Sequence, residues 1–269
     1  ITFFGKFHNQ MVLVLCTLLP GSLAGRHLTN RAVSGKIPCG GCNVNDDRDE
    51  RMEKVLAVHD RLLDQYGEPT WRRHLDPVAE LVSTILSQNT NDKNRDVAFE
   101  RLRERFDSWE DVRDGGLDDV IDAIRPAGLA NQKGPRIQEA LRFITEERGD
   151  LDLEFLADWP VVEAKAWLSS IKGVGPKTAA IVLLFSLGQP AFPVDTHVHR
   201  VSQRLGLIGQ KASREKAHDE LETIVPEAYY YPFPLNLIRH GRQICASRNP
   251  KCDECVLRDL CDYYQERIE

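Results

Sequence analysis

The most informative stretch of the chain is LSSIKGVGPKTAA, residues 168–180. It reads as the end of one helix, a tight Gly-x-Gly turn and a new helix opened by Pro176, since proline is favoured in the first helical turn. Gly173 and Gly175 permit left-handed backbone angles and the close approach of another backbone. The free amides at the start of the new helix can bind a phosphate group. On its own, the stretch predicts equally well a clamp for a DNA backbone or a plain packing corner between two helices.

The sequence on both sides of this stretch has the period of α-helices. From Met52 onward one helical pattern follows another, without the alternation that marks strands. Apolar residues recur at i, i+3, i+4 and i+7 spacing in the segments that begin at Val78 and Ile137. We expect Pro135 in the first turn of the second of these helices and Ser213 as the N-cap of a later one. The body is therefore predicted to be all-α.

Composition sets limits on the class of protein. A chain of 269 residues can fold as one large domain or two small ones, and 42% hydrophobic with 28% charged residues is ordinary for a globular protein. The net charge of -6 is unfavourable for a nucleic-acid partner unless Lys and Arg gather locally. Seven cysteines exclude a complete set of internal disulfides. Their gathering near the two chain ends favours a metal site in a reducing compartment, so we expect a cytoplasmic protein.

The first residues do not fit the pattern of the body. The chain begins with Ile1, and residues 11–19 form an apolar run that resembles a weak signal peptide. That run is too short to span a bilayer, and no membrane association is expected. Cys39 and Cys42 have metal-ligand spacing without a second pair nearby, which favours incidental thiols. We expect residues 1–51 to be an extension, disordered or with a misassigned start, and the folded body to begin near Met52.

Two motifs resemble a known family. IKGVGPKTA, residues 171–179, resembles the helix–hairpin–helix of the endonuclease III branch of the HhH-GPD DNA glycosylases, and PVDTHVHR, residues 193–200, resembles the Val-Asp-Thr-His motif of that branch. The likeness runs from about Met52 to Tyr264. It implies two helical lobes with a DNA cleft between them. One would be a six-helix barrel with the hairpin, residues 71–189, and the other an iron–sulfur cluster lobe made of residues 52–70 and 190–269.

The same resemblance assigns catalytic roles to Lys177 and Asp195. A lysine amine can form a Schiff base with the C1′ carbon of a deoxyribose that is losing its base. A nearby carboxylate can stabilise positive charge on the sugar or deprotonate the nucleophile. Each residue also has a simpler interpretation, because Asp195 could only cap the next helix and Lys177 could be solvated or bind phosphate. The occurrence of both residues in both motifs favours catalysis.

A run of four cysteines follows the pattern Cys-x6-Cys-x2-Cys-x5-Cys. Thiolates select zinc or iron–sulfur clusters over hard cations, and the spacing alone leaves these two open. The resemblance to the endonuclease III cluster loop implies a [4Fe-4S] cluster, which would mainly order a segment with little core of its own. The expected ligands are Cys245, Cys252, Cys255 and Cys261.

The resemblance also implies residues that hold DNA once a base has left the stack. Gln88 would fill the gap in the duplex, and Leu129 would act as an apolar wedge. Alternatively, Gln88 could be a helix C-cap and Leu129 a buried anchor. The chain reads Ser-Gln-Asn-Thr where bacterial members typically read Ser-Ala-Gln, which also allows a shift by one residue. Further expected DNA contacts are Gly173, Gly175, Arg248 and Lys251. The expected basic face consists of Lys172, Lys177, Arg200, Arg204, Arg242, Arg248 and Lys251.

These features together predict a monomeric base-excision repair enzyme, a DNA glycosylase with abasic-site lyase activity. Its expected substrate is double-stranded DNA with damaged bases, above all oxidised pyrimidines, or with abasic sites. A mismatch or adenine glycosylase of the same fold is the first alternative, although such relatives usually lack a lysine at the position of Lys177. A non-catalytic DNA-binding module and a zinc-bound form of the enzyme are the others.

Overall fold

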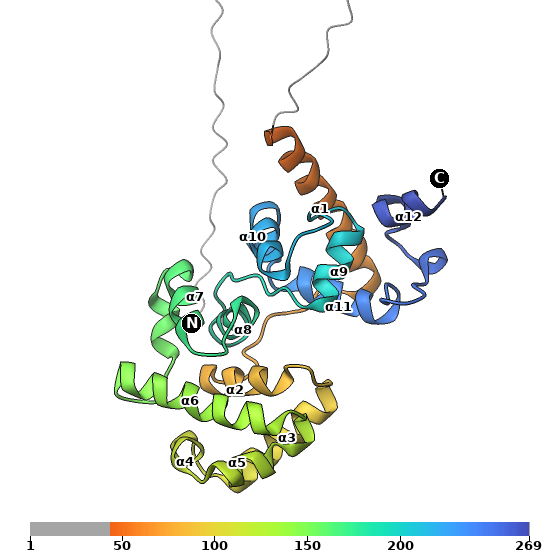
Figure 1. The fold of residues 1–269 in the computed structure, drawn as a ribbon. Helices are drawn as coiled ribbons and strands as arrows, with labels where there is room; N and C mark the ends of the chain where they lie inside the picture. The colour runs from red at the N-terminus through yellow and green to blue at the C-terminus, as the bar shows by residue number, and fades with distance from the viewer. Residues whose placement is uncertain (1–43, 269) are drawn as a thin grey trace, which may run out of the picture. The chain divides into compact units, whose positions relative to one another are not determined.

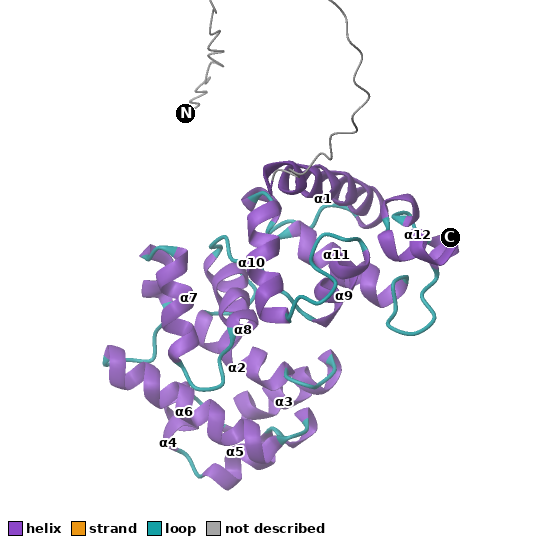
Figure 2. Ribbon diagram, turned by 45° about the horizontal axis from the view of Figure 1, so that its top comes forward, coloured by secondary structure: helices purple, strands orange, loops and turns teal. Residues whose placement is uncertain are grey.

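The computed structural model describes residues 44–268, and all regular structure in this range is helical (Figure 2). The all-α prediction is confirmed. Within the same range no helix is long and apolar enough to cross a bilayer. The α-helices are α1 (Val44–Tyr66), α2 (Pro77–Ser87), α3 (Asp92–Arg105), α4 (Trp109–Asp114), α5 (Leu117–Ala123), α6 (Ala130–Arg148), α7 (Val161–Ser170), α8 (Pro176–Ile181), α9 (Thr196–Arg204), α10 (Arg214–Ile224), α11 (Pro232–Gln243) and α12 (Asp262–Ile268). Shorter helices are η1 (Arg125–Ala127), η2 (Glu154–Asp158), the π-helical η3 (Val182–Ser186), η4 (Glu227–Tyr229), η5 (Cys252–Glu254) and η6 (Arg258–Leu260).

Two helix starts differ from the sequence-based expectation. Helix α1 begins at Val44, before the start expected near Met52, while residues 1–43, with Cys39 and Cys42, lie outside the described part. The prediction that Pro135 opens a helix was wrong, because α6 begins at Ala130 and contains this proline. The start is set upstream by Leu129, whose carbonyl accepts from the backbone N–H groups of the first turn. A proline near the start of a long helix removes only one hydrogen bond from its interior.

The first hydrophobic cluster is built around α2. The buried face of this helix extends over Val78, Leu81, Val82, Ile85 and Leu86, as the spacing predicts. Asp76 caps its first turn by accepting from the backbone N–H of Ala79 at 2.9 Å. Apolar residues from α3 to α8 pack around α2, so that the cluster includes buried residues between Val78 and Ala191.

The second cluster joins the two ends of the body. Val55, Val58 and Leu62 of α1 pack with apolar residues of α9, α10 and α11, and Figure 1 shows α1 beside α11 although they lie far apart in the sequence. Lys54 and Arg61 on α1 form ion pairs with Asp262 and Asp259, which attach the last segment of the chain to the first helix.

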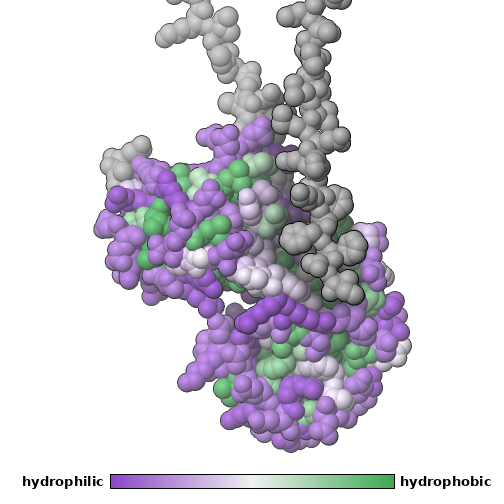
Figure 3. Space-filling view, turned by 180° about the vertical axis from the view of Figure 1, so that it is seen from behind, coloured by the Kyte–Doolittle hydropathy of each residue, from purple (hydrophilic) through white to green (hydrophobic). Residues whose placement is uncertain are grey.

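The face of the molecule drawn in Figure 3 is largely hydrophilic. On the face drawn in Figure 3, hydrophobic residues occur in scattered patches among charged and polar ones. Scattered apolar side chains of this kind are normal for a protein surface.

Candidate active site and cysteine cluster site

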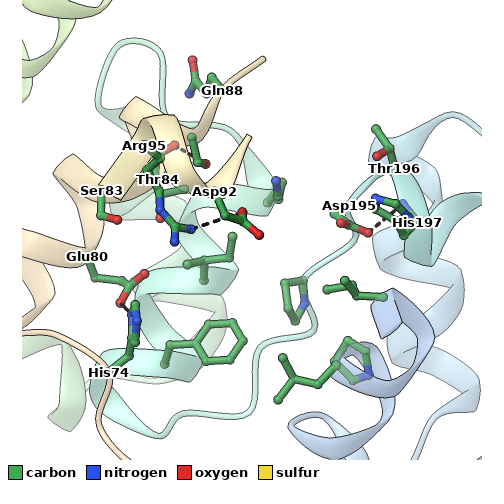
Figure 4. A pocket seen from close by; sticks show the side chains of 18 of the residues that line it. His74, Glu80, Ser83, Thr84, Gln88, Asp92, Arg95, Asp195, Thr196 and His197 are labelled. Carbon is green, nitrogen blue, oxygen red and sulfur yellow. Dashed lines mark hydrogen bonds and ion pairs between the residues drawn. The ribbon is translucent and has the colours of Figure 1, made fainter. Parts of the chain in front are cut away.

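A cavity of about 840 Å³ is lined by residues of α2 and α8, which pack into the first hydrophobic cluster, and of α11, which packs into the second. The helix α2 contributes one wall, while the segment before α9 and the helix α11 contribute the wall across from it (Figure 4). Lys177 and Asp195, which the sequence selects as catalytic, both line it. Other lining residues are His74, Glu80, Ser83, Thr84, Gln88, Asn89, Asp92, Arg95, Ile181, Phe185, His197 and Arg242.

The hairpin turn fixes the position of Lys177. The side chains of Ile171 and Val174 are buried on either side of the turn, and Gly173 between them has a φ of 86°, which favours glycine. An added Cβ at Gly173 would also come within 3.4 Å of the Arg136 side chain. Helix α8 starts directly after the turn. Lys177 therefore lies in the first turn of a well-packed helix and reaches the cavity.

The helix that carries Lys177 continues as the π-helical segment η3. Two carbonyl groups of this segment accept hydrogen bonds from residues that precede α2. Trp71 donates from Nε1 to the Leu184 carbonyl at 2.8 Å, and the backbone N–H of His74 donates to the Phe185 carbonyl at 3.1 Å. Single π-helical turns often occur at functional sites, and this one directly follows α8, the helix that carries Lys177. Nothing in the local sequence predicted it.

Asp195 is the N-cap of α9. Its Oδ1 accepts from the backbone N–H groups of His197 at 2.8 Å and Val198 at 2.7 Å. The capping role that the sequence left open is thus confirmed. Both bonds go to Oδ1, so Oδ2 takes part in neither, and the half-buried residue lines the cavity. The two roles of Asp195 are compatible.

The opposite wall of the cavity holds an acid–imidazole pair that the sequence did not reveal. Glu80 on α2 is buried, and its Oε2 lies 2.7 Å from Nδ1 of His74 (Figure 4). The hydrogen bond to Glu80 raises the pKa of His74, although burial and the nearby Arg95 oppose this shift. The sequence feature that could have revealed this pair is Glu80, a glutamate that lies within the buried stripe of α2.

The loop after α2 begins with two candidates for the same DNA-contacting role, Gln88 and Asn89, which differ in their contacts and exposure. Gln88 is the C-cap of α2, as one alternative stated. Its Nε2 donates to the Gly173 carbonyl at 3.4 Å and its Oε1 accepts from Arg136 Nη1 at 3.3 Å. Asn89 is exposed, has a φ of 53° and lines the cavity. The residue that a one-position shift would select is therefore more accessible than Gln88.

Leu129 is exposed rather than anchored in the core. Its residue surface is 48% accessible, which makes the alternative of a buried anchor wrong. Its backbone has a φ of 51° and follows Gly128, which also has a positive φ. A bulky residue rarely adopts this conformation, and such strain is typical of functional loops.

The four cysteines of the carboxyl-terminal segment line one small cavity together with Tyr263 and Tyr264. All four cysteines are half-buried and have free thiols. Burial raises the pKa of Cys255 to about 11 and also raises that of Cys261, and the other cysteines add to the rise. Among the described residues, no group of histidine, cysteine, aspartate or glutamate side chains has the geometry of a metal site. Four converging thiols nonetheless provide the donor set that soft metals need.

Two arginines of α9 support this segment. Arg204 donates from Nη1 to Cys245 Sγ at 3.2 Å and to the Ala246 carbonyl at 2.8 Å. Arg200 donates to the carbonyls of Cys245 at 3.1 Å and Gly241 at 2.9 Å. Placing these two arginines on a DNA-facing basic surface was therefore wrong, because their guanidinium groups are used within the protein.

The remaining residues of the expected basic face lie at the surface. Lys172 pairs with Glu139 at 3.2 Å and Arg242 pairs with Asp92 at 2.9 Å. Arg248 is exposed. Lys251 is also exposed and lies 3.8 Å from Glu254. Exposed pairs of this kind contribute little stability, so these cations can exchange their partners.

Comparison with known proteins agrees with this geometry. A family model of the HhH-GPD superfamily of base excision DNA repair proteins matches residues 82–227. A second model, the iron–sulfur binding domain of endonuclease III, matches residues 245–261. Endonuclease III of Thermotoga maritima is 35% identical over 199 residues, which cover 74% of this chain and 89% of that protein.

Solved structures extend the likeness to the fold. The structure of a non-covalent endonuclease III–DNA complex matches with a TM-score of 0.70 and 27% identity, covering 81% of this chain and 98% of that chain. The structure of a trapped endonuclease III–DNA covalent intermediate gives a TM-score of 0.70 and 26% identity, over 81% and 99%.

The chain therefore belongs to the HhH-GPD superfamily of base-excision DNA repair proteins. Within this superfamily it is an enzyme of the endonuclease III type, a DNA glycosylase with abasic-site lyase activity. Its carboxyl-terminal segment binds an iron–sulfur cluster, so the zinc alternative is not supported.

Proposed function

We propose that this enzyme removes oxidised pyrimidines from double-stranded DNA and then cleaves the strand at the abasic site. The observation that carries the proposal is that Lys177 and Asp195 line one cavity large enough for an extruded nucleotide. The similar structure of a trapped endonuclease III–DNA covalent intermediate supports covalent chemistry. We further propose that the enzyme acts as a monomer in the cytoplasm.

The first step we propose is displacement of the base. The amine of Lys177 forms a bond to C1′ of the deoxyribose while the bond from C1′ to the base nitrogen breaks, and the base leaves with the bonding electron pair and takes up a proton from water. The free Oδ2 of Asp195 stabilises positive charge on the sugar or accepts a proton from the attacking amine. The fixed cap geometry at Oδ1 holds the carboxylate in one orientation, which costs no reorganisation during the reaction.

The second step cleaves the strand. Opening of the sugar ring gives an imine between Lys177 and C1′, and the imine makes the protons at C2′ acidic. Loss of one C2′ proton expels the 3′ phosphate, so that the strand is cut on the 3′ side. Water then hydrolyses the imine and returns the free lysine.

We propose that the cluster is of the [4Fe-4S] type and has a structural role. Cys245, Cys252, Cys255 and Cys261 would hold it as thiolates. When bound, it would close short loops in a segment with little apolar core. That constraint would keep the exposed Arg248 and Lys251 facing the DNA backbone.

The proposal is tested by borohydride trapping on a duplex with one oxidised pyrimidine. Wild type should give a covalent protein–DNA adduct, whereas Lys177→Ala should give none and should lose at least about 100-fold in base release. Lys172→Ala is the matched control, since this lysine lies in the hairpin turn just before α8, is exposed and pairs with Glu139. It should be trapped like wild type.

Two further outcomes decide between the parts of the proposal. Trapping on a plain abasic site, but not on the oxidised base, would keep the lyase chemistry and contradict the lesion class. An adduct that persists in Lys177→Ala would contradict the assignment of the nucleophile.

A further inference from the structure

Lys133 is a fully buried lysine on α6, and its residue surface is 1% accessible. It lies one turn before Ile137 on the stripe that packs into the core. A lysine in such a position is rare unless it is paired. Burial lowers the pKa of Lys133 because the charged ammonium group loses hydration. Solvation therefore does not explain why a lysine occurs at this position.

Three uncharged acceptors receive the ammonium group of Lys133. Nζ donates to the Leu86 carbonyl, to Thr90 Oγ1 and to the Ala127 carbonyl, each at 2.8 Å. These bonds use all three of its N–H donors. A neutral apolar side chain would leave the buried Leu86 carbonyl without this donor and would remove one of the hydrogen bonds at Thr90 and at the Ala127 carbonyl.

The three acceptors flank the exposed residues Asn89 and Leu129, with Leu86 in the last turn of α2, Thr90 in the loop after it and Ala127 at the end of η1. Leu86 and Thr90 lie on either side of Asn89, and Ala127 lies just before the turn to Leu129. The hydroxyl of Thr90 also donates to the Ala127 carbonyl. One buried side chain therefore joins both loops at a single point.

Both loops contain a residue in the left-handed region of backbone angles. Asn89 has a φ of 53°, which asparagine tolerates better than most residues, and Leu129 has a φ of 51°, which costs a bulky residue free energy. The backbone N–H of Lys133 also donates to the Leu129 carbonyl at 3.0 Å. Strained residues persist only when their surroundings determine their geometry, and Lys133 supplies that constraint on both sides.

We infer that Lys133 is a positioning residue that holds the Asn89 and Leu129 loops ready to enter the base stack of bound DNA. The inference rests on the proposed function, because it takes a nucleotide extruded into the cavity as the substrate. Lys133 contacts neither sugar nor base and acts through the two loops. Preorganised loops lose less conformational entropy on binding.

The test uses a duplex with a stable abasic-site analogue and 2-aminopurine in the opposite strand. Fluorescence of 2-aminopurine rises when its stacking is disturbed. Saturating wild-type enzyme should raise it, and Lys133→Met should give less than half of that rise. Single-turnover excision of an oxidised pyrimidine by Lys133→Met should fall by about 10- to 100-fold, the scale expected for misplaced groups.

Gln138→Met is the matched control on the same helix. Gln138 is buried, and its Nε2 donates to the carbonyls of Val112 at 2.9 Å and Gly115 at 2.8 Å, which lie in neither loop. This variant loses buried hydrogen bonds as Lys133→Met does, yet its fluorescence rise at saturation should match that of wild type.

Thr90→Val provides a second, milder variant. It removes one acceptor of Lys133 and the link to Ala127 while leaving the lysine in place, and should give an intermediate loss of fluorescence. A wild-type rise in Lys133→Met, or in Thr90→Val where Lys133→Met does not fold, would overturn the inference. So would an equal loss in Gln138→Met. Failure of wild type to excise the base would count against the proposed function alone, since the fluorescence measurement needs no catalysis.

Discussion

The hairpin around Lys177 and the cysteine segment, residues 245–261, are held in place by different interactions. Around the hairpin, Leu168, Ile171, Val174 and Ala179 are all buried in the first hydrophobic cluster. In the cysteine segment Leu257 is the one fully buried side chain. Apolar packing therefore fixes the proposed nucleophile, whereas the segment beyond Cys245 is held by polar contacts and, in our proposal, by the cluster. We therefore expect the fold to tolerate loss of Lys177 but not the loss of a cluster cysteine.

The largest effect is expected from breaking the weaker of these two regions. Cys255→Ser should abolish the broad visible absorbance of the cluster and expose the segment after Cys245 to limited proteolysis. A structural metal site supplies on the order of 10 kcal/mol, more than any single side-chain contact here. Lys177→Ala is the control and should keep both the absorbance and the resistance to protease. A brown, protease-resistant Cys255→Ser protein would contradict the difference between the regions.

Sequence reasoning succeeded where local chemistry determines the outcome. The buried stripe of α2, the turn at Gly173 and the cap at Ser213 follow from residue types and spacing alone. The positions of Lys177 and Asp195 at one cavity could be inferred only through the family resemblance, because these residues lie on different helices.

The failures share a cause, which is that tertiary partners lie far away in the sequence. Arg200 and Arg204 look like surface cations on an amphipathic helix, but their guanidinium groups donate to the carbonyls of Cys245 and Ala246 in the cysteine segment. Lys133 lies on the apolar stripe of α6, so its burial could have been suspected, but not its three acceptors. Pro135 was misplaced because the start of α6 depends on the strained backbone at Leu129.

A smaller effect is expected from two substitutions of Asp195 that separate its capping of α9 from its proposed role in the reaction. Asp195→Asn keeps a capping side chain, since asparagine and aspartate cap equally well. Its stability should stay within about 0.5 kcal/mol of wild type, while base excision should fall by about 100-fold or more because the carboxylate is lost. Asp195→Ala should lose about 1 kcal/mol in addition, through the two backbone N–H groups left without Oδ1.

Urea unfolding and single-turnover excision measure these two quantities separately. Equal stability of the Asn and Ala variants would contradict a role of the cap in holding α9. Wild-type excision by Asp195→Asn would contradict a role of the carboxylate in the reaction.

The smallest effect concerns the opposite wall of the cavity, where His74 faces Glu80. The pKa of His74 is raised above its ordinary value of 6.5, mainly by the hydrogen bond to Glu80. A raised pKa in the folded state means that the pair stabilises the protein fully below about pH 6.5, and that this stabilisation disappears as the pH rises through the raised pKa. Because the His74 side chain is 56% exposed, the contribution should stay below about 1 kcal/mol.

Urea unfolding of wild type and His74→Gln at about pH 5.5 and about pH 8.5 isolates this contribution, since other groups titrate alike in both proteins. The variant should be less stable than wild type at the lower pH, and the gap should narrow at the higher one. A gap that widens with pH would show that His74 is used as a neutral acceptor or packing group. In that case the wall formed by α2 would resemble the hairpin, where packing rather than charge holds the chain.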